Sequence, residues 1–275
     1  MAKKTETITE LFGETIISLG FATAVDLQSA LEEQKAREAR GEKPILIGML
    51  MVEMGFITLN QFVTAINSRK KDLNLFLSED AVRIATRVKA LFSDSDKVIA
   101  FSSARENEGV SSLTAQFAIA LTLMGEGSIL LVDSYPDNSS LHNFFRLPQY
   151  PGLFEILEKK QDYRQLIQAT SLPTLSLLTA GKHAGSSFPL FLSEAFPELI
   201  SSVRAEYRFV LIDTPPFLNY PESAVVASRT DGVVLLISAG QRSKSEIVEV
   251  KRNLDGLRVK VFGYVLSEKS HSIFF

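Results

Sequence analysis

The sequence predicts an α/β fold with a doubly wound, mainly parallel sheet, preceded by a small all-α domain. Two observations predict it: short apolar runs alternate with helical stretches from residue 97 onward, and residues 8–69 carry a repeat of helical character. A third is a glycine-bearing loop directly after the first apolar run, where ligands of such sheets bind. We place the domains at residues 1–72 and 97–275, with residues 73–96 as a linker helix.

Composition excludes several classes of function. The formal net charge of -3, with acids and bases mixed along the chain, gives no basic stripe, so we expect no nucleic-acid partner. The absence of cysteine excludes disulfides and thiolate metal sites. The start is too polar for a secretory signal and no apolar run reaches the roughly 18 residues that span a bilayer. We expect a cytoplasmic protein, peripheral to the inner membrane through a partner.

The first element is an internal repeat, in which ITELFGETIISLGFATAVDLQSALEEQ aligns with KPILIGMLMVEMGFITLNQFVTAINSR. Each copy predicts a short amphipathic helix ended by a glycine, then a threonine N-cap that opens a second helix. The repeat therefore predicts four helices in two hairpins. The recurring glycines are Gly13 with Gly48 and Gly20 with Gly55.

Six apolar runs follow the linker helix and predict the strands of the sheet. They are continuous rather than alternating, which is typical of strands buried on both faces. The runs are KVIAF (97–101), SILLVD (128–133), TLSLLTA (174–180), FVLID (209–213), GVVLLIS (232–238) and VKVFGYVLS (259–267).

The loop SSARENEGVSS (102–112) joins the first strand to a helix, an order that is typical of a phosphate cradle. Such a loop needs glycines for its backbone, a lysine that reaches the phosphates and a hydroxyl that binds Mg²⁺. Gly109 and Ser111 meet two of these needs. Val110 stands where the lysine belongs.

In order and spacing, these motifs resemble the bacterial tyrosine kinase (BY-kinase, CpsD/CapB-like) family, a branch of the ParA/MinD-type P-loop ATPases that works in capsule and exopolysaccharide synthesis. The resemblance covers about residues 78–270 and implies a P-loop NTPase fold. SARENEGVSS stands at the Walker A loop, SILLVDSYPDNSSLHNFF at the A-prime motif and FVLIDTPPF at Walker B. It implies nucleotide contacts by Arg105, Gly109, Ser111, Ser112 and Ser267, Mg²⁺ ligands in Ser111, Asp133 and Asp213, and catalytic candidates in Asp133, Asp213 and Arg105.

The departures from this family fall on catalytic positions. Val110 replaces the lysine, Tyr135 replaces the second A-prime aspartate, and Glu106 and Glu108 add negative charge beside the phosphate position. The tail EKSHSIFF lacks the tyrosine cluster of BY-kinases. The pattern predicts a pseudokinase, a non-catalytic regulator or scaffold of an envelope polysaccharide or related surface system. It would require no cofactor and bind ATP or ADP with Mg²⁺ weakly at most.

Arg105 supports the alternative, an atypical ATPase or protein-tyrosine autokinase that uses this arginine or a partner's cation. The competing interpretation is a solvated loop arginine that pairs with Glu106 or Glu108. Whether the chain is an enzyme stays open at this point.

Two further resemblances concern partners. Residues 8–69 resemble the MshEN-like domain of secretion and pilus ATPases, which implies cyclic di-GMP binding, but Leu11, Phe12, Leu46 and Ile47 stand where binding members carry Arg-Leu. The alternative is a helical docking module whose glycines are helix ends. SEDAVRIATR resembles the oligomerisation helix of BY-kinases through Asp80 and Arg83, whereas Thr86 stands at the third position and Arg87 lies one residue beyond it. We therefore expect a homo- or hetero-oligomer with protein partners such as a membrane-bound activator.

Overall fold

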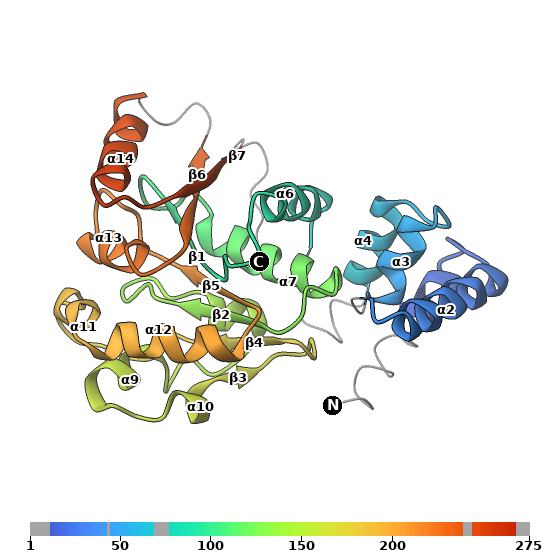
Figure 1. The fold of residues 1–275 in the computed structure, drawn as a ribbon, viewed down its shortest axis with the longest axis horizontal. Coiled ribbons are helices and arrows are strands. Elements are labelled where there is room, and N and C mark those ends of the chain that lie inside the picture. The colour runs from blue at the N-terminus through green and yellow to red at the C-terminus, as the bar shows by residue number, and fades with distance from the viewer. Residues whose placement is uncertain (1–11, 43–44, 69–76, 239–243, 268–275) are drawn as a thin grey trace.

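The computed structural model describes residues 12–42, 45–68, 77–238 and 244–267. A seven-stranded sheet carries helices on both faces, and a small group of helices formed by the N-terminal part of the chain lies beside it (Figure 1). Within the described residues, no helix combines the length and hydropathy that a bilayer crossing requires.

The N-terminal group confirms the predicted repeat of two helical hairpins. Residues 12–18 are helical. The other three helices are α2 (Ala24–Ala39), α3 (Ile47–Glu53) and α4 (Leu59–Ser68). Gly20 and Gly55 end the first helix of each hairpin with φ of 68° and 76°, values that glycine adopts without strain. Thr23 then caps α2 through a reciprocal capping box with Asp26.

The other two recurring glycines have a different role from the helix ends that the docking interpretation assigned to them. Gly13 and Gly48 lie inside helices, where a Cβ would come within 2.8 Å of Leu27 and 2.5 Å of Phe62, respectively. Their missing side chains allow the two helices of each hairpin to approach closely. This corrects the interpretation for two of the four glycines.

Helix α6 (Glu79–Lys89) joins this group to the sheet region and begins at the N-cap Ser78. Asn67 of α4 bonds both the N–H and the C=O of Leu77, at 3.0 and 2.8 Å. The N–H of Ser78 then donates to Gln116 of α7 (Val110–Leu123) at 2.8 Å. The apolar core of the helical group is continuous with that around α7. The domain boundary near residue 72 stays a prediction.

The sheet confirms the predicted α/β fold and all six predicted strands. Its order is β3-β4-β2-β5-β1-β6-β7. The strands are β1 (Val98–Ser103), β2 (Ile129–Asp133), β3 (Gln168–Ala169), β4 (Leu175–Leu178), β5 (Phe209–Asp213), β6 (Gly232–Ser238) and β7 (Val261–Ser267). Only the two-residue β3, which the sequence did not predict, is antiparallel among these strands; the other pairs are parallel.

Helices bury both faces of the sheet, in agreement with the continuous apolar runs. Helices α6, α7 and α8 (Leu141–Phe145) share one core with one face. The other face packs against two groups of helices. These helices are α9 (Leu153–Lys159), α10 (Tyr163–Leu166), α11 (Phe188–Leu192), α12 (Ala195–Glu206), α13 (Pro221–Ala227) and α14 (Lys244–Gly256).

Candidate functional site

The loop between β1 and α7 lies at the carboxyl edge of the sheet and has the backbone of a phosphate-binding loop. Gly109 is the N-cap of α7 with φ 90°, and Asn107 also adopts a left-handed φ, 59°. The segment after β5 fixes the start of this loop, because Thr214 N donates to Phe101 O and Phe217 N to Ser103 O. The loop is therefore held by the strand next to it.

The first turn of α7 directs unpaired donors toward the loop. The N–H groups of Val110, Ser111 and Ser112 have no hydrogen-bond partner in the part of the chain that the structure describes. Together with the dipole of a 14-residue helix, such donors favour an anion. The side chain of Ser112 is held from behind by Gln116, at 3.3 Å.

A cavity of about 190 Å³ opens at this point. Its volume is below the roughly 300–1,000 Å³ of a typical small-molecule site. Four predicted nucleotide contacts, Arg105, Gly109, Ser111 and Ser112, line it; Ser267 does not. The other lining residues are Ser103, Glu106, Asn107, Glu108, Val110, Tyr135, Asn138, Ser140, Thr214 and Pro216.

Asp133 and Asp213 end adjacent strands and are paired in the register of β2 and β5, as the positions of the two motifs predicted. Asp133 is fully buried and accepts bonds from Ser139 Oγ at 2.8 Å and from the N–H groups of Tyr135 and Leu141. Burial raises the pKa of Asp133 to about 6, although the Ser139 hydroxyl opposes the shift.

Asp213 has fewer hydrogen-bond partners than Asp133 among the described residues. It is 1% exposed, and neither of its carboxylate oxygens has a hydrogen-bond partner among the described residues. Burial, and then the charge of Asp133, raise the pKa of Asp213 well above its ordinary value. The Ser111 hydroxyl opposes this shift, although it forms no hydrogen bond of ordinary geometry with the carboxylate. Two buried acids with an orphaned carboxylate are the arrangement that a cation would relieve.

Two tyrosines lie beside the loop: Tyr135, at the position that the resemblance assigns to an aspartate, and Tyr220, whose ring contacts it. Tyr135 is 7% exposed, and its ring meets that of Tyr220 edge-on at 5.2 Å. Burial, and then the Tyr220 hydroxyl, raise the pKa of Tyr135. Tyr220 OH donates to Glu106 at 3.2 Å. Tyr135 thus lines the cavity with a protonated, neutral hydroxyl group, and Tyr220 packs against it. No motif in the sequence indicates Tyr220, because it lies beyond FVLIDTPPF (209–217).

Arg105 is held by a residue that the sequence did not indicate. Its Nε donates to Glu246 of α14 at 2.9 Å, and not to Glu106 or Glu108 as the competing interpretation expected. The prediction of an ion-paired loop arginine was therefore right in kind and wrong in partner. Glu108 is 4% exposed, so its carboxylate is turned in from solvent within the loop.

These residues fit a magnesium phosphate only in part. The free N–H groups of α7, the Ser111 hydroxyl and the orphaned Asp213 carboxylate supply an anion cradle and hard oxygen ligands. Val110, at the position that the resemblance assigns to a lysine, lines the cavity, and its side chain packs against the apolar core around α7.

The remaining predicted residues lie away from this cavity. Asp80, Arg83 and Arg87 are exposed on α6, and Arg83 pairs with Glu79 of its own helix. Phe12 and Ile47, at two of the arginine-leucine positions of the repeat, are buried in the helical core. Leu11 lies outside the described residues.

Comparison with known proteins places this geometry in a family. The family model described as "Cellulose biosynthesis protein BcsQ" matches residues 96–255. Tyrosine-protein kinase YwqD of Bacillus subtilis is 30% identical over 203 residues, 74% of this chain and 84% of that protein. Tyrosine-protein kinase CpsD of Streptococcus agalactiae is 28% identical over 191 residues, 69% of this chain and 83% of its own length.

Solved structures agree with these relatives. The chimerical protein CapA2B2 matches with a TM-score of 0.64 and 26% identity, covering 70% of this chain and 84% of its own. The kinase domain of the Escherichia coli tyrosine kinase ETK has the same fold, with a TM-score of 0.64 at 21% identity over 71% of this chain and 78% of its own. The MshEN-like resemblance stays a prediction. The chain therefore belongs to the BcsQ family of P-loop proteins and is homologous to the bacterial tyrosine-protein kinases.

Proposed function

We propose that this protein is a non-catalytic member of its family, which regulates or scaffolds a bacterial surface-polysaccharide system. The P-loop region would then serve as a binding surface for a protein partner such as a membrane-bound activator. The description of the matching family, a cellulose biosynthesis protein, supports the polysaccharide context.

One observation carries the proposal. Among the described residues that line the cavity, Arg105 is the single cation, and its guanidinium is bonded to Glu246. Val110 supplies no charge, and Glu106 and Glu108 line the same cavity with carboxylates. An incoming triphosphate would therefore meet acids and free amides, with only an arginine that is already ion-paired to balance its charge.

The energetic consequence is larger for turnover than for binding. A hydrogen bond to a charged group is worth about 1.5–3 kcal/mol, so loss of the lysine weakens binding roughly ten- to a hundred-fold. Phosphoryl transfer is catalysed almost entirely by positioning and charge neutralisation, which leaves little to replace the missing cation. We therefore infer a site that retains the geometry of the fold without its catalytic power.

The test is to incubate the purified full chain with ATP and Mg²⁺ and to measure released phosphate and phosphotyrosine. YwqD from Bacillus subtilis serves as the positive control. We expect no phosphotyrosine and no turnover above the buffer blank. Phosphate release that grows with protein concentration and disappears in Arg105→Ala would contradict the proposal.

That outcome would favour the second candidate, an ATPase or tyrosine autokinase in which Arg105 or a partner supplies the cation. Its support is that Arg105 lines the cavity. The ion pair makes a distinguishing prediction, because Glu246→Ala would free the guanidinium and raise turnover in an Arg105-dependent enzyme. In a non-catalytic protein, Glu246→Ala would leave turnover at the blank.

For residues 1–72 we propose a helical docking module, because buried apolar side chains occupy two of the arginine-leucine positions and the repeated glycines are explained by helix ends and helix packing. The alternative is cyclic di-GMP sensing. Calorimetric titration of the full chain with cyclic di-GMP separates them, because micromolar affinity would favour the sensor.

A further inference from the structure

The strand β7 forms an exposed edge of the sheet. It is the last strand in the sheet order, so its outer backbone groups pair with no strand in the described ranges. Its sequence, VFGYVLS, contains no charged residue and no proline. Natural sheets usually protect an edge with such residues, because an open row of N–H and C=O groups binds another strand. The opposite edge, β3, is only two residues long.

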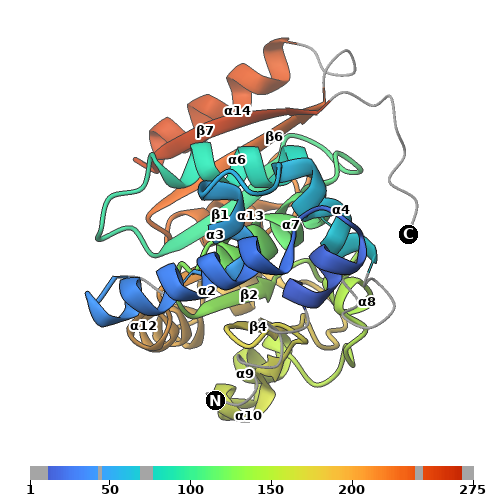
Figure 2. The same cartoon turned by 90° about the vertical axis from the view of Figure 1, so that its right-hand side faces the viewer.

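Apolar side chains are exposed on this strand and on helix α14. Tyr264 and Leu266 of β7 are 44% and 70% exposed, and Val248 and Leu257 of α14 are 38% and 43% exposed. Figures 1 and 2 show β7 and α14 together at one end of the molecule, away from the N-terminal helices. Large exposed apolar side chains on an open edge strand are typical of an interface.

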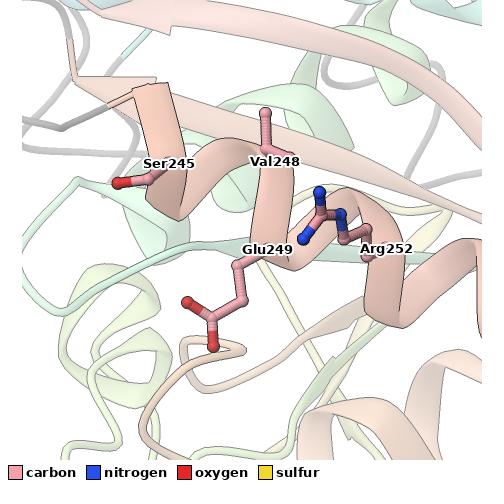
Figure 3. A pocket seen from close by; sticks show the side chains of 4 residues that line it. All are labelled: Ser245, Val248, Glu249 and Arg252. Atoms are coloured by element: carbon pink, nitrogen blue, oxygen red, sulfur yellow. The ribbon is translucent and has the colours of Figure 1, made fainter.

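Helix α14 adds charges of both signs to this surface. A shallow hollow on it is lined by Ser245, Val248, Glu249 and Arg252, whose side chains project from the exposed side of the helix (Figure 3). Neither Glu249 nor Arg252 forms an ion pair with a described residue. Lys251 forms an ion pair with Asp255 within the helix, which raises the pKa of Lys251. Helix α14 thus carries both acids and bases.

These features indicate which kind of partner would pair with the open edge of β7. An open row of backbone donors and acceptors requires a strand, and an uncharged strand with alternating exposed apolar side chains can pair with its own copy in antiparallel orientation. A two-fold axis near Tyr264 would also place both copies of α14 on the same face of the joined sheet. Their mixed charges would then meet opposite charges, since Glu249 and Arg252 are exchanged across the axis.

We propose that two copies of this chain form a dimer by antiparallel pairing of β7 with β7, supported by Tyr264, Leu266 and the exposed face of α14. The sheet becomes continuous across the dimer. The contact does not involve the oligomerisation residues predicted on α6, and it does not depend on whether the P-loop is catalytic.

The first experiment measures the mass of the full chain in solution by sedimentation equilibrium at tens of micromolar protein. We expect a dimer. Leu266→Lys should weaken association about tenfold or more, because charge on an edge strand opposes pairing. Val25→Lys is the matched control, since Val25 is 73% exposed on α2 and far from the edge. Far-UV circular dichroism should be unchanged in both variants because both positions are exposed.

The second experiment tests whether the two-fold axis of the proposed dimer lies near Tyr264. The chain contains no cysteine, so a single introduced cysteine can form a disulfide only with its copy. Directly opposite residues of an antiparallel pair have Cα atoms about 4.5–5.5 Å apart, within reach of a disulfide. Tyr264→Cys should give a cross-linked dimer under mild oxidant at low protein concentration, whereas Val25→Cys should remain monomeric in a denaturing gel.

Three results would overturn the proposal. The first is a wild-type chain that is monomeric at tens of micromolar. The second is a dimer that Leu266→Lys leaves intact and Arg83→Glu on α6 dissociates. The third is equal cross-linking of Tyr264→Cys and Val25→Cys, which would indicate random collision. Loss of the dimer in Leu266→Lys with retention in Arg83→Glu supports it.

Discussion

Gly109 sets the backbone at the start of α7, with φ of 90°, and a Cβ added there would meet no described atom closer than 3.9 Å. The cost of a side chain is therefore backbone strain alone. We expect Gly109→Ala to lower the free energy of unfolding by about 1–2 kcal/mol. Gly256→Ala is the control, because a Cβ at that helical glycine would meet open space and its φ is not positive. The free energy of unfolding of this variant should stay within about 0.5 kcal/mol of the wild-type value. Urea denaturation of both variants measures the difference.

A substitution at Val110 measures how much nucleotide affinity a single lysine adds to the loop. We expect Val110→Lys alone to recover little affinity for ADP or ATP, because Glu106 and Glu108 still line the cavity and Asn107 occupies a left-handed position. Combination with Asn107→Gly, Glu106→Gln and Glu108→Gln should recover substantially more. Isothermal titration calorimetry measures the affinities, with Val25→Lys as a control for added charge. Micromolar binding by the unmodified chain would contradict this prediction.

At the scale of the elements, the carboxylate of Asp96 links the loop before β1 to the residue that precedes β7. Asp96 is 8% exposed and accepts bonds from Ser93 N at 2.8 Å and Lys260 Nζ at 3.1 Å. Burial by itself would raise the pKa of Asp96, but these bonds lower it below 3.8 overall. The charged form is therefore favoured by folding, and its contribution is present above pH 3.8 and lost as the pH falls through the lower folded-state pKa.

We expect Asp96→Asn to lower the free energy of unfolding by about 1 kcal/mol at pH 7, a modest value because Lys260 is half exposed. The difference from the wild type should stay constant down to about pH 5 and narrow below pH 3.8. Asp94→Asn is the matched control, because Asp94 is exposed two residues away. Urea denaturation at several pH values measures both; a difference that grows on acidification would contradict the assignment.

The helical hairpins depend on the glycines inside their first helices. Gly48→Ala would place a Cβ 2.5 Å from the ring of Phe62, which is 1% exposed and cannot move aside. We expect a loss of about 1–3 kcal/mol. Gly13→Ala should cost less, because the half-buried Leu27 can rotate away. In a double-mutant cycle measured by thermal unfolding, Phe62→Leu should recover part of the loss in Gly48→Ala; purely additive effects would exclude the contact as its cause.

At the scale of the whole molecule, the repeat predicts that residues 1–72 fold by themselves, because its two hairpins present complementary apolar faces. The structure adds contacts beyond that boundary, in which Asn67 holds Leu77 and Gln116 holds Ser78. We expect a 1–72 segment to melt cooperatively when followed by circular dichroism, at a lower temperature than in the full chain. A melt without a sigmoidal transition would move the boundary into α6.

The predictable parts of this molecule are those that depend on local pattern. Six strands followed from continuous apolar runs, and the adjacency of Asp133 and Asp213 followed from their places at strand ends. The two-residue β3 carries no pattern of its own, because only its pairing with β4 defines it. The partner of Arg105 was unpredictable because Glu246 is 141 residues away and approaches the loop only through the packing of α14.

The position of β1 in the middle of the sheet has a consequence for the order of folding during synthesis. Although β1 is made first, its two neighbours are β5 and β6, which begin at residues 209 and 232. At typical translation rates the ribosome needs on the order of ten seconds to reach them. During that interval the helical hairpins can fold, because their contacts are local. The uncharged segment VIAFSS, which becomes β1, has no strand to pair with until β5 and β6 are synthesised. The nascent chain therefore passes through a stage in which an uncharged apolar segment is complete and unpaired, a stage that favours chaperone binding.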